Sequence, residues 1–145
     1  MRSFFFRLIG ILEIAGGFLG VVASVRRLLP LGSTYETLMA LIALAVFGFI
    51  LVAGVLLVEG SERGVALSRV AQLLQLPLLA TPVLSYALHA GAFVNVFATL
   101  QSTPRLGIDW HVGGHGFVLA LAGPAVSRVG INLLALLSWL VLRLR

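Results

Sequence analysis

Five polar side chains lie within long apolar stretches of this chain, where a membrane protein would place groups that bind or exchange protons. They are Glu13, His89, Asn95, Arg128 and Asn132. If apolar helices begin at residues 4, 78 and 124, then Glu13, His89 and Asn132 fall near the bilayer midplane, since a helix rises about 1.5 Å per residue. Asn95 and Arg128 fall about one turn closer to the outer face. The spacing therefore predicts a buried polar layer.

Glu13 can be interpreted in two ways, because an acid near the middle of an apolar helix costs a few kcal/mol or more unless it finds a partner. In the functional interpretation, Glu13 exchanges a proton or a cation during transport, with His89 as a relay. In the structural interpretation, Glu13 is neutral or paired and its hydrogen bonds across helices fix one arrangement of the bundle. We favour the structural interpretation, since a single acid with no second acid nearby gives little to drive a transport cycle.

Residues 11–17, with the sequence Ile-Leu-Glu-Ile-Ala-Gly-Gly, carry a local resemblance to a known family. The segment resembles the first helix of the small multidrug resistance transporters, which are four-helix proteins with one essential membrane glutamate. In that family the glutamate binds protons and cationic drugs, so the resemblance implies such a role for Glu13. Those transporters are shorter and have tight loops, and we use the resemblance as an analogy only.

Composition indicates an integral membrane protein. Of the 145 residues, 60% are hydrophobic and 10% are charged, and the mean hydropathy is +1.11. Soluble proteins carry roughly 25% charged residues. The chain has no cysteine, which excludes disulfides, thiolate metal sites and cysteine nucleophiles. Its formal charge of +5 comes from arginines beside apolar runs, where they would meet lipid phosphates, and we expect no binding to nucleic acid.

The apolar runs predict one integral membrane domain over residues 1–145. Its four transmembrane helices lie at about residues 4–25, 37–58, 78–100 and 124–142. The first could instead be a signal peptide, although an acid within the apolar part of a signal peptide is unusual. Ser33 and Glu36 have the spacing of a capping box and predict the start of the second helix. Pro77 and Pro82 interrupt the third run, so residues 64–76 are predicted to form a separate interfacial helix.

Residues 107–120 have a different pattern, because Ile108, Trp110 and Val112 alternate with polar residues or glycine. The pair Gly113 and Gly114 is typical of a two-residue turn, and we predict a short β-hairpin. The alternative is that the last helix begins within residues 117–122. The predicted fold class is therefore an all-α membrane protein with four transmembrane helices and a short extracytoplasmic β-hairpin between helices 3 and 4.

Four spans place both termini on one side of the membrane. More arginines fall on that side than on the other, and the positive-inside rule then puts both termini in the cytoplasm. We therefore predict a multi-pass protein of the cell inner (plasma) membrane.

The first predicted helix has a stripe of small residues that lets another helix approach closely. Gly16 and Gly20 have small-xxx-small spacing, and Gly10 and Gly17 lie near the same stripe. The close neighbour is a helix of the same chain or a second copy, and we expect packing within one chain.

Catalysis and metal binding have little support. Asp109, His111 and His115 have the side-chain types of metal ligands, but on the predicted hairpin His115 lies on the other face from the other two. We expect no enzyme activity, no metal and no cofactor.

The predicted function is a non-enzymatic structural, accessory or assembly role, exerted through helix–helix and envelope-protein contacts. The expected partners are the lipid bilayer and a membrane or envelope protein or further copies of the chain. The first alternative is a proton-coupled small transporter or channel centred on Glu13. The second is an oligomeric pore-forming effector.

Overall fold

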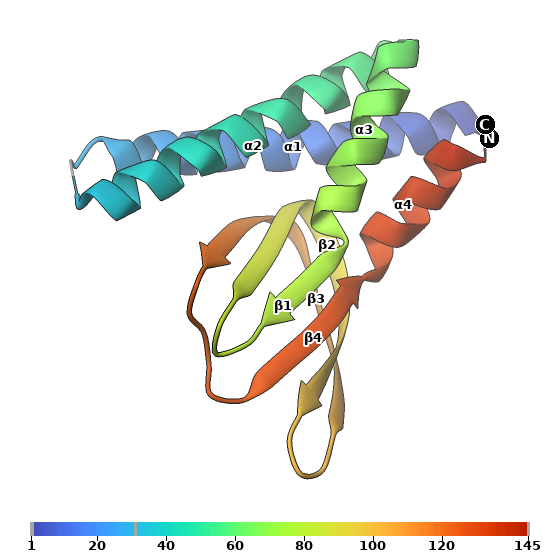
Figure 1. The fold of residues 1–145 in the computed structure, drawn as a ribbon. Coiled ribbons are helices and arrows are strands. Elements are labelled where there is room, and N and C mark those ends of the chain that lie inside the picture. The colour runs from blue at the N-terminus through green and yellow to red at the C-terminus, as the bar shows by residue number, and fades with distance from the viewer. Residues whose placement is uncertain (1, 31, 145) are drawn as a thin grey trace.

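The computed structural model describes residues 2–30 and 32–144, which form a helical hairpin with a curled β-sheet attached to it (Figure 1). The elements in chain order are α1 (Arg2–Leu28), α2 (Thr34–Val58), α3 (Glu62–Gln75), β1 (Pro77–Ala80), β2 (Ser85–Leu100), β3 (Arg105–Ala120), β4 (Ser127–Asn132) and α4 (Leu133–Arg143).

The helical hairpin follows from local signals in the sequence. The predicted capping box is confirmed, because the Ser33 hydroxyl accepts from the Glu36 amide and the Glu36 carboxylate accepts from the Ser33 amide. At the other end of α2, Gly60 has a φ of 78°, and the helix ends there because glycine adopts this left-handed conformation without strain. Helices α1 and α2 contain the first two predicted spans, and α3 overlaps the predicted interfacial helix.

Two helices are long and apolar enough to cross a membrane, namely residues Ser3–Leu28 and Thr34–Val58. The prediction of four transmembrane helices is wrong, and so is the four-helix bundle that it implies. Residues 78–100 form β1, a turn and β2 instead of a third span. Pro77 and Pro82 prevent a continuous helix, and the valine, phenylalanine and threonine residues that follow favour a strand.

The fourth predicted span, residues 124–142, is also not one long helix. Its first part is β4, and α4 has 11 residues, which rise about 16 Å and cannot cross the hydrocarbon core. The Asn132 side chain accepts hydrogen bonds from the amides of Leu134 and Ala135, and so begins α4 as its N-cap.

The predicted hairpin at residues 107–120 is wrong as well, because these residues belong to the single strand β3. Its partner is β2, in a register that runs from Ser85 opposite Ala120 to Thr99 opposite Arg105. Gly113 has a φ of 78° and lies at a bulge, where the register shifts between Gly91 and Ala92. A glycine pair at a bulge looks like a turn in the sequence, because a turn and a bulge both favour glycine in the left-handed backbone conformation.

Strands β1, β4 and β2 close on one another, while β3 ends the sheet. Strand β1 pairs with β4 and with the start of β2, and β4 pairs with the end of β2. In the described residues β3 pairs with β2 alone, so its other edge is open. The closed strands give the sheet a concave inner face and a convex outer face.

The sheet meets the hairpin halfway along α1 (Figure 1). Gly91 has a φ of 87°, and an added Cβ there would lie 2.2 Å from the carbonyl oxygen of Leu12. The main core lies between α2, α3 and β2. Its buried members are Ala43, Phe47, Ile50, Ala53, Ala71, Leu88 and Ala90.

Candidate functional site

Glu13 lies inside the protein and is held by two side chains of α3. Only 1% of the Glu13 surface is exposed. The Ser68 hydroxyl donates to Glu13 Oε2 at 2.7 Å, and the Gln72 amide donates to Glu13 Oε1 at 2.8 Å. Both carboxyl oxygens therefore have partners, and the group joins α1 to α3.

Ser68 extends this cluster to α2. Its Oγ also lies 3.3 Å from the carbonyl oxygen of Ala53. Because a hydroxyl carries one hydrogen, it can donate fully to only one of the two oxygens at a time. A proton on Glu13 would make both contacts good hydrogen bonds, with the acid donating to Ser68 and Ser68 donating to Ala53.

The space beside Glu13 is small. The cavity there has a volume of about 10 Å³. A water molecule needs roughly 10–15 Å³ measured in this way, so the cavity barely holds one. The arrangement suits a packing lock between three helices.

A second polar cluster lies on the concave face of the sheet, around a cavity of about 260 Å³. Its polar members are Ser85, His89 and Asn95 of β2, Asp109 of β3 and Arg128 of β4. Asn95 Nδ2 and His89 Nε2 are 2.9 Å apart. Burial lowers the pKa of His89, while the bond to Asn95 and the charge of Asp109 act in the opposite direction.

Asn95 is incompletely satisfied. It is 3% exposed, and its Oδ1 has no hydrogen-bond partner among the described residues. The Arg128 guanidinium lies 4.6 Å from the centre of the Phe97 ring, which holds its charge at the rim of the same cavity.

The predicted polar layer is thus divided between two places. His89, Asn95 and Arg128 line one cavity, and Asn132 lies opposite Asn95 in the pairing of β4 with β2. Glu13 is apart from them, with partners on α3. The separation arises because residues 78–132 form a sheet, so depth along a helix does not describe their positions.

The predicted glycine stripe lies at close contacts within the chain. An added Cβ at Gly10, Gly17 or Gly20 would come within 3 Å of α2 side chains or backbone. At Gly16 it would lie 1.9 Å from the Gly91 amide nitrogen, so this glycine packs against β2. Gly10, Gly17 and Gly20 therefore allow α2 to pack closely on α1, and Gly16 allows β2 to do so.

The structure also brings in residues that the sequence interpretation did not assign to a site. Ser68, Gln72 and Gln75 lie on one face of α3 and are all buried. The Gln75 side chain accepts from the Ala90 amide at 2.9 Å, next to the register shift between β2 and β3. Their spacing of four and three residues places them on one helical face, and that signal was available in the sequence.

No group of three or more histidine, cysteine, aspartate or glutamate residues that could hold a metal ion occurs in the described part of the chain.

Comparison of the chain with protein-family models, with curated proteins and with solved structures finds no match.

Proposed function

We propose that this chain is a membrane-embedded, non-enzymatic assembly protein whose sheet pairs with the sheet of a second copy through the open edge of β3. The observation that carries the proposal is this open edge of a sheet whose outer face is apolar and which is attached halfway along a helix of membrane-spanning length.

The second half of helix α3 supports hydrocarbon as the surroundings, because its polar side chains are buried and its large apolar side chains are exposed. The buried face carries Ser68, Gln72 and Gln75 together with the small residue Ala71. Its outward face carries Val70, which is 47% exposed, and Leu73, which is 46% exposed. In water an amphipathic helix buries its apolar side. The reversed arrangement is stable where the solvent is lipid.

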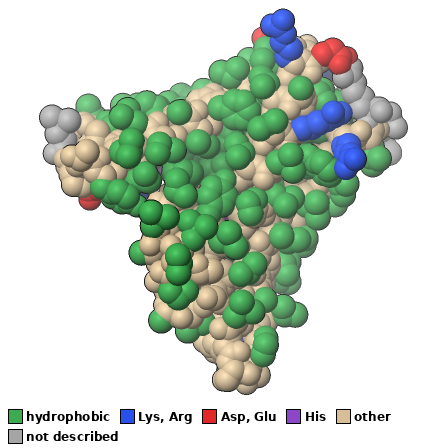
Figure 2. All heavy atoms as spheres, in the orientation of Figure 1, with side chains coloured by type: hydrophobic (Ala, Val, Ile, Leu, Met, Phe, Trp, Pro, Cys, Tyr) green, Lys and Arg blue, Asp and Glu red, His purple; other side chains and the backbone are tan. Residues whose placement is uncertain are grey.

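The outer face of the sheet has the same character. In β3, Leu106, Ile108, Trp110 and Val112 are 66 to 84% exposed. Their partners on β2 are also apolar, and they are Ala98, Val96, Val94 and Ala92. On the far side of β2, Val96 and Ala98 pair with the apolar residues Ile131 and Val129 of β4. Figure 2 shows hydrophobic side chains over the hairpin and the sheet, with the visible charges gathered mainly where α3 begins.

The depth of the sheet in the membrane means that the open edge of β3 requires a partner strand. The sheet contacts α1 near Leu12 and Gly16, midway between Arg7 and Arg26. These arginines are separated by about 28 Å along the helix, close to the thickness of the hydrocarbon core. An unpaired backbone group in hydrocarbon costs several kcal/mol, so an open sheet edge at this depth must be covered.

A second copy fits this edge. In an antiparallel pairing of two β3 strands with Trp110 on the two-fold axis, Ile108 lies opposite Val112 of the partner, and Asp109 lies opposite His111 of the partner. The apolar face then continues from one copy to the next, and the acid meets a base. An interface of this kind is self-complementary, as two-fold symmetry requires.

The test uses the absence of cysteine from the chain. Trp110→Cys is reconstituted into vesicles at high dilution in lipid and treated with a short thiol-specific crosslinker. We expect a crosslinked dimer. The matched control is Leu29→Cys, because Leu29 is 76% exposed but lies at the end of the hairpin. We expect this variant to remain uncrosslinked, because Leu29 lies away from the paired edge.

A second readout does not depend on the introduced thiol. Asp109→His should reduce the dimer fraction measured by native mass spectrometry, and the exchange Asp109→His with His111→Asp should restore it. A wild-type protein that is monomeric in lipid, or equal crosslinking at both positions, would overturn the proposal. A complex with a different protein in place of the second copy would also overturn it.

The orientation follows from the arginines. Arg7, Arg63, Arg69 and Arg143 lie at the end of the hairpin where both chain ends also lie, and Arg26 and Arg27 lie at the other end. The positive-inside rule favours the first end in the cytoplasm. A plasma membrane location with both termini cytoplasmic is therefore part of the proposal.

A further inference from the structure

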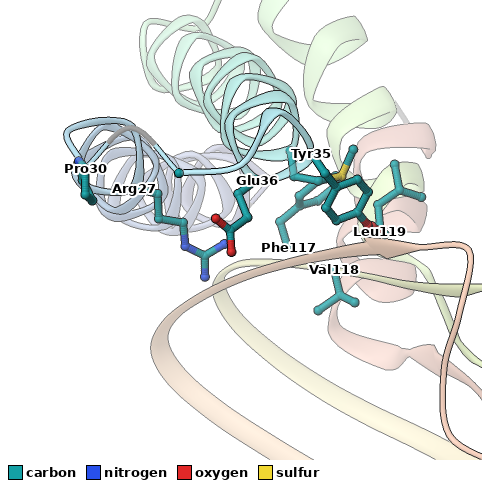
Figure 3. A pocket seen from close by; sticks show the side chains of 9 residues that line it. Arg27, Pro30, Tyr35, Glu36, Phe117, Val118 and Leu119 are labelled. Atoms are coloured by element: carbon teal, nitrogen blue, oxygen red, sulfur yellow. The ribbon is translucent and has the colours of Figure 1, made fainter.

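A third cavity lies where the tip of the helical hairpin meets the end of β3 (Figure 3). Its volume is about 680 Å³. The residues that line it are Arg27, Pro30, Gly32, Tyr35, Glu36, Met39, Phe117, Val118 and Leu119. It is separate from both polar clusters described above.

The rim of this cavity carries one positive and one negative side chain. Arg27 lies in the last turn of α1, and Glu36 lies in the first turn of α2. The Glu36 Oε2 atom accepts from the Ser33 amide at 3.2 Å, which leaves Oε1 for another donor. Within residues 2–30 and 32–144, no ion pair within 4.0 Å joins Arg27 to Glu36. The two charges face the same opening (Figure 3).

The floor of the cavity is apolar and lies deeper along the hairpin. Met39 is almost one helical turn below Glu36, which corresponds to about 4.5 Å along α2. Phe117 and Leu119 of β3 form the opposite side, and the Tyr35 hydroxyl donates to the Leu119 carbonyl oxygen at 3.3 Å. That bond fixes the wall of the cavity at the end of the open strand.

The position of the cavity corresponds to a membrane boundary. Arg27 lies at the end of the apolar part of α1 and Glu36 at the start of the charge-free part of α2, and Tyr35 is an aromatic residue of the kind found at the interface. A ligand at this boundary meets charges at the level of the lipid headgroups and apolar side chains below them.

We propose that this cavity binds the headgroup of a zwitterionic phospholipid with a primary ammonium group, such as phosphatidylethanolamine. The Arg27 guanidinium binds the phosphate, Glu36 Oε1 binds the ammonium, and an acyl chain lies along Met39 and Phe117. The Glu36 carboxylate would repel a lipid with an anionic headgroup, and the Arg27 guanidinium would repel a simple cation. The inference rests on the hairpin crossing the membrane, as in the proposed function, but not on the pairing of β3.

The test compares lipid binding by native mass spectrometry of wild-type protein released from nanodiscs. The nanodiscs contain equal amounts of phosphatidylethanolamine, phosphatidylcholine and phosphatidylglycerol. We expect phosphatidylethanolamine to be retained about fivefold over each of the other two, the ratio that one modest ion pair provides. Soluble phosphoethanolamine, added as a competitor, should displace little lipid, because it lacks the acyl chain.

Two variants and a control assign the charges. Glu36→Gln keeps the capping box, since glutamine serves at that position, and should remove the preference over phosphatidylglycerol. Arg27→Gln should reduce the retention of all three lipids. Arg26→Gln changes the neighbouring arginine, which does not line the cavity, and should leave the preference intact.

Equal retention of the three lipids by the wild type would overturn this proposal, and so would a preference that survives Glu36→Gln. Displacement by soluble phosphoethanolamine would assign the site to a free phosphate ester instead. A monomeric protein that retains phosphatidylethanolamine would overturn the pairing of β3 and leave the lipid site in place.

Discussion

Gln72 of α3 donates its side-chain amide to Glu13 Oε1 of α1 at 2.8 Å, and neither residue is more than 7% exposed. This bond and the one from Ser68 attach the third helix to the hairpin through side chains that a soluble protein would place outside. Because both donors must reach the same carboxyl group, the two bonds fix the position of α3 along α1.

Removal of the Glu13 carboxyl group should destabilise the fold. Glu13→Ala leaves the side chains of Ser68 and Gln72 buried with a lost partner, and each such group costs about 1–3 kcal/mol. Glu13→Gln keeps the shape and one hydrogen-bonding oxygen, so we expect a smaller loss. Thermal unfolding in detergent, followed by circular dichroism, measures both. Equal stability of the wild type and Glu13→Ala would contradict the packing lock.

Two glycines of the hairpin should respond in opposite ways to the same substitution. At Gly16 an added Cβ would lie 1.9 Å from the backbone of Gly91, so Gly16→Ala must displace β2 from α1. At Gly48 nothing lies within 4 Å of an added Cβ. Alanine also favours a helix over glycine by about 1 kcal/mol.

We therefore expect Gly16→Ala to lower the unfolding temperature in detergent and Gly48→Ala to leave it unchanged or raise it. If Gly48→Ala lost as much stability as Gly16→Ala, the loss in Gly16→Ala could not be assigned to the contact of β2 with α1.

The stability of the sheet should depend on pH through His89. Burial lowers the pKa of this histidine in the folded state, so the unfolded chain binds a proton more readily. Stability is then fully present above the unfolded pKa of about 6.5, and it falls as the pH decreases below that value toward the folded pKa.

The measurement is the unfolding temperature between pH 8 and pH 5, compared among variants. His89→Gln should flatten the dependence on pH, whereas His111→Gln should retain it because His111 is exposed. A dependence that is identical in all three proteins would assign the titration to another group.

Parts of this fold were predictable from particular residues. Ser33 and Glu36 locate the start of α2 because capping depends on local hydrogen bonds, and the charge-free run after them has the length of a membrane helix. Glu13 was identified as the buried acid because no other charge lies in its stretch of helix. Its actual partners share one face of α3 at helical spacing, but that helix had been interpreted as lying at the membrane surface.

The sheet was not predicted, because hydropathy does not distinguish a helix from a strand in a long apolar run. Residues 85–100 contain no acidic residue, lysine or arginine. On β3 the alternation of faces is reversed at Gly113, the extra residue where the register with β2 shifts. The partners of β2 are supplied by β3 and β4, and such distant pairing leaves no local signal. The cavity around His89 and Arg128 depends on these pairings and could not be foreseen.

The closed arrangement of β1, β4 and β2 has a consequence for biosynthesis. The hairpin of α1 and α2 uses only early residues and can insert while the ribosome is still translating. Strand β1, by contrast, lacks its main neighbour until Ser127–Asn132 emerge, about 50 residues later. Strand β4 thus closes the sheet, so that a chain which stops short of Ser127 inserts its hairpin but leaves its sheet unclosed.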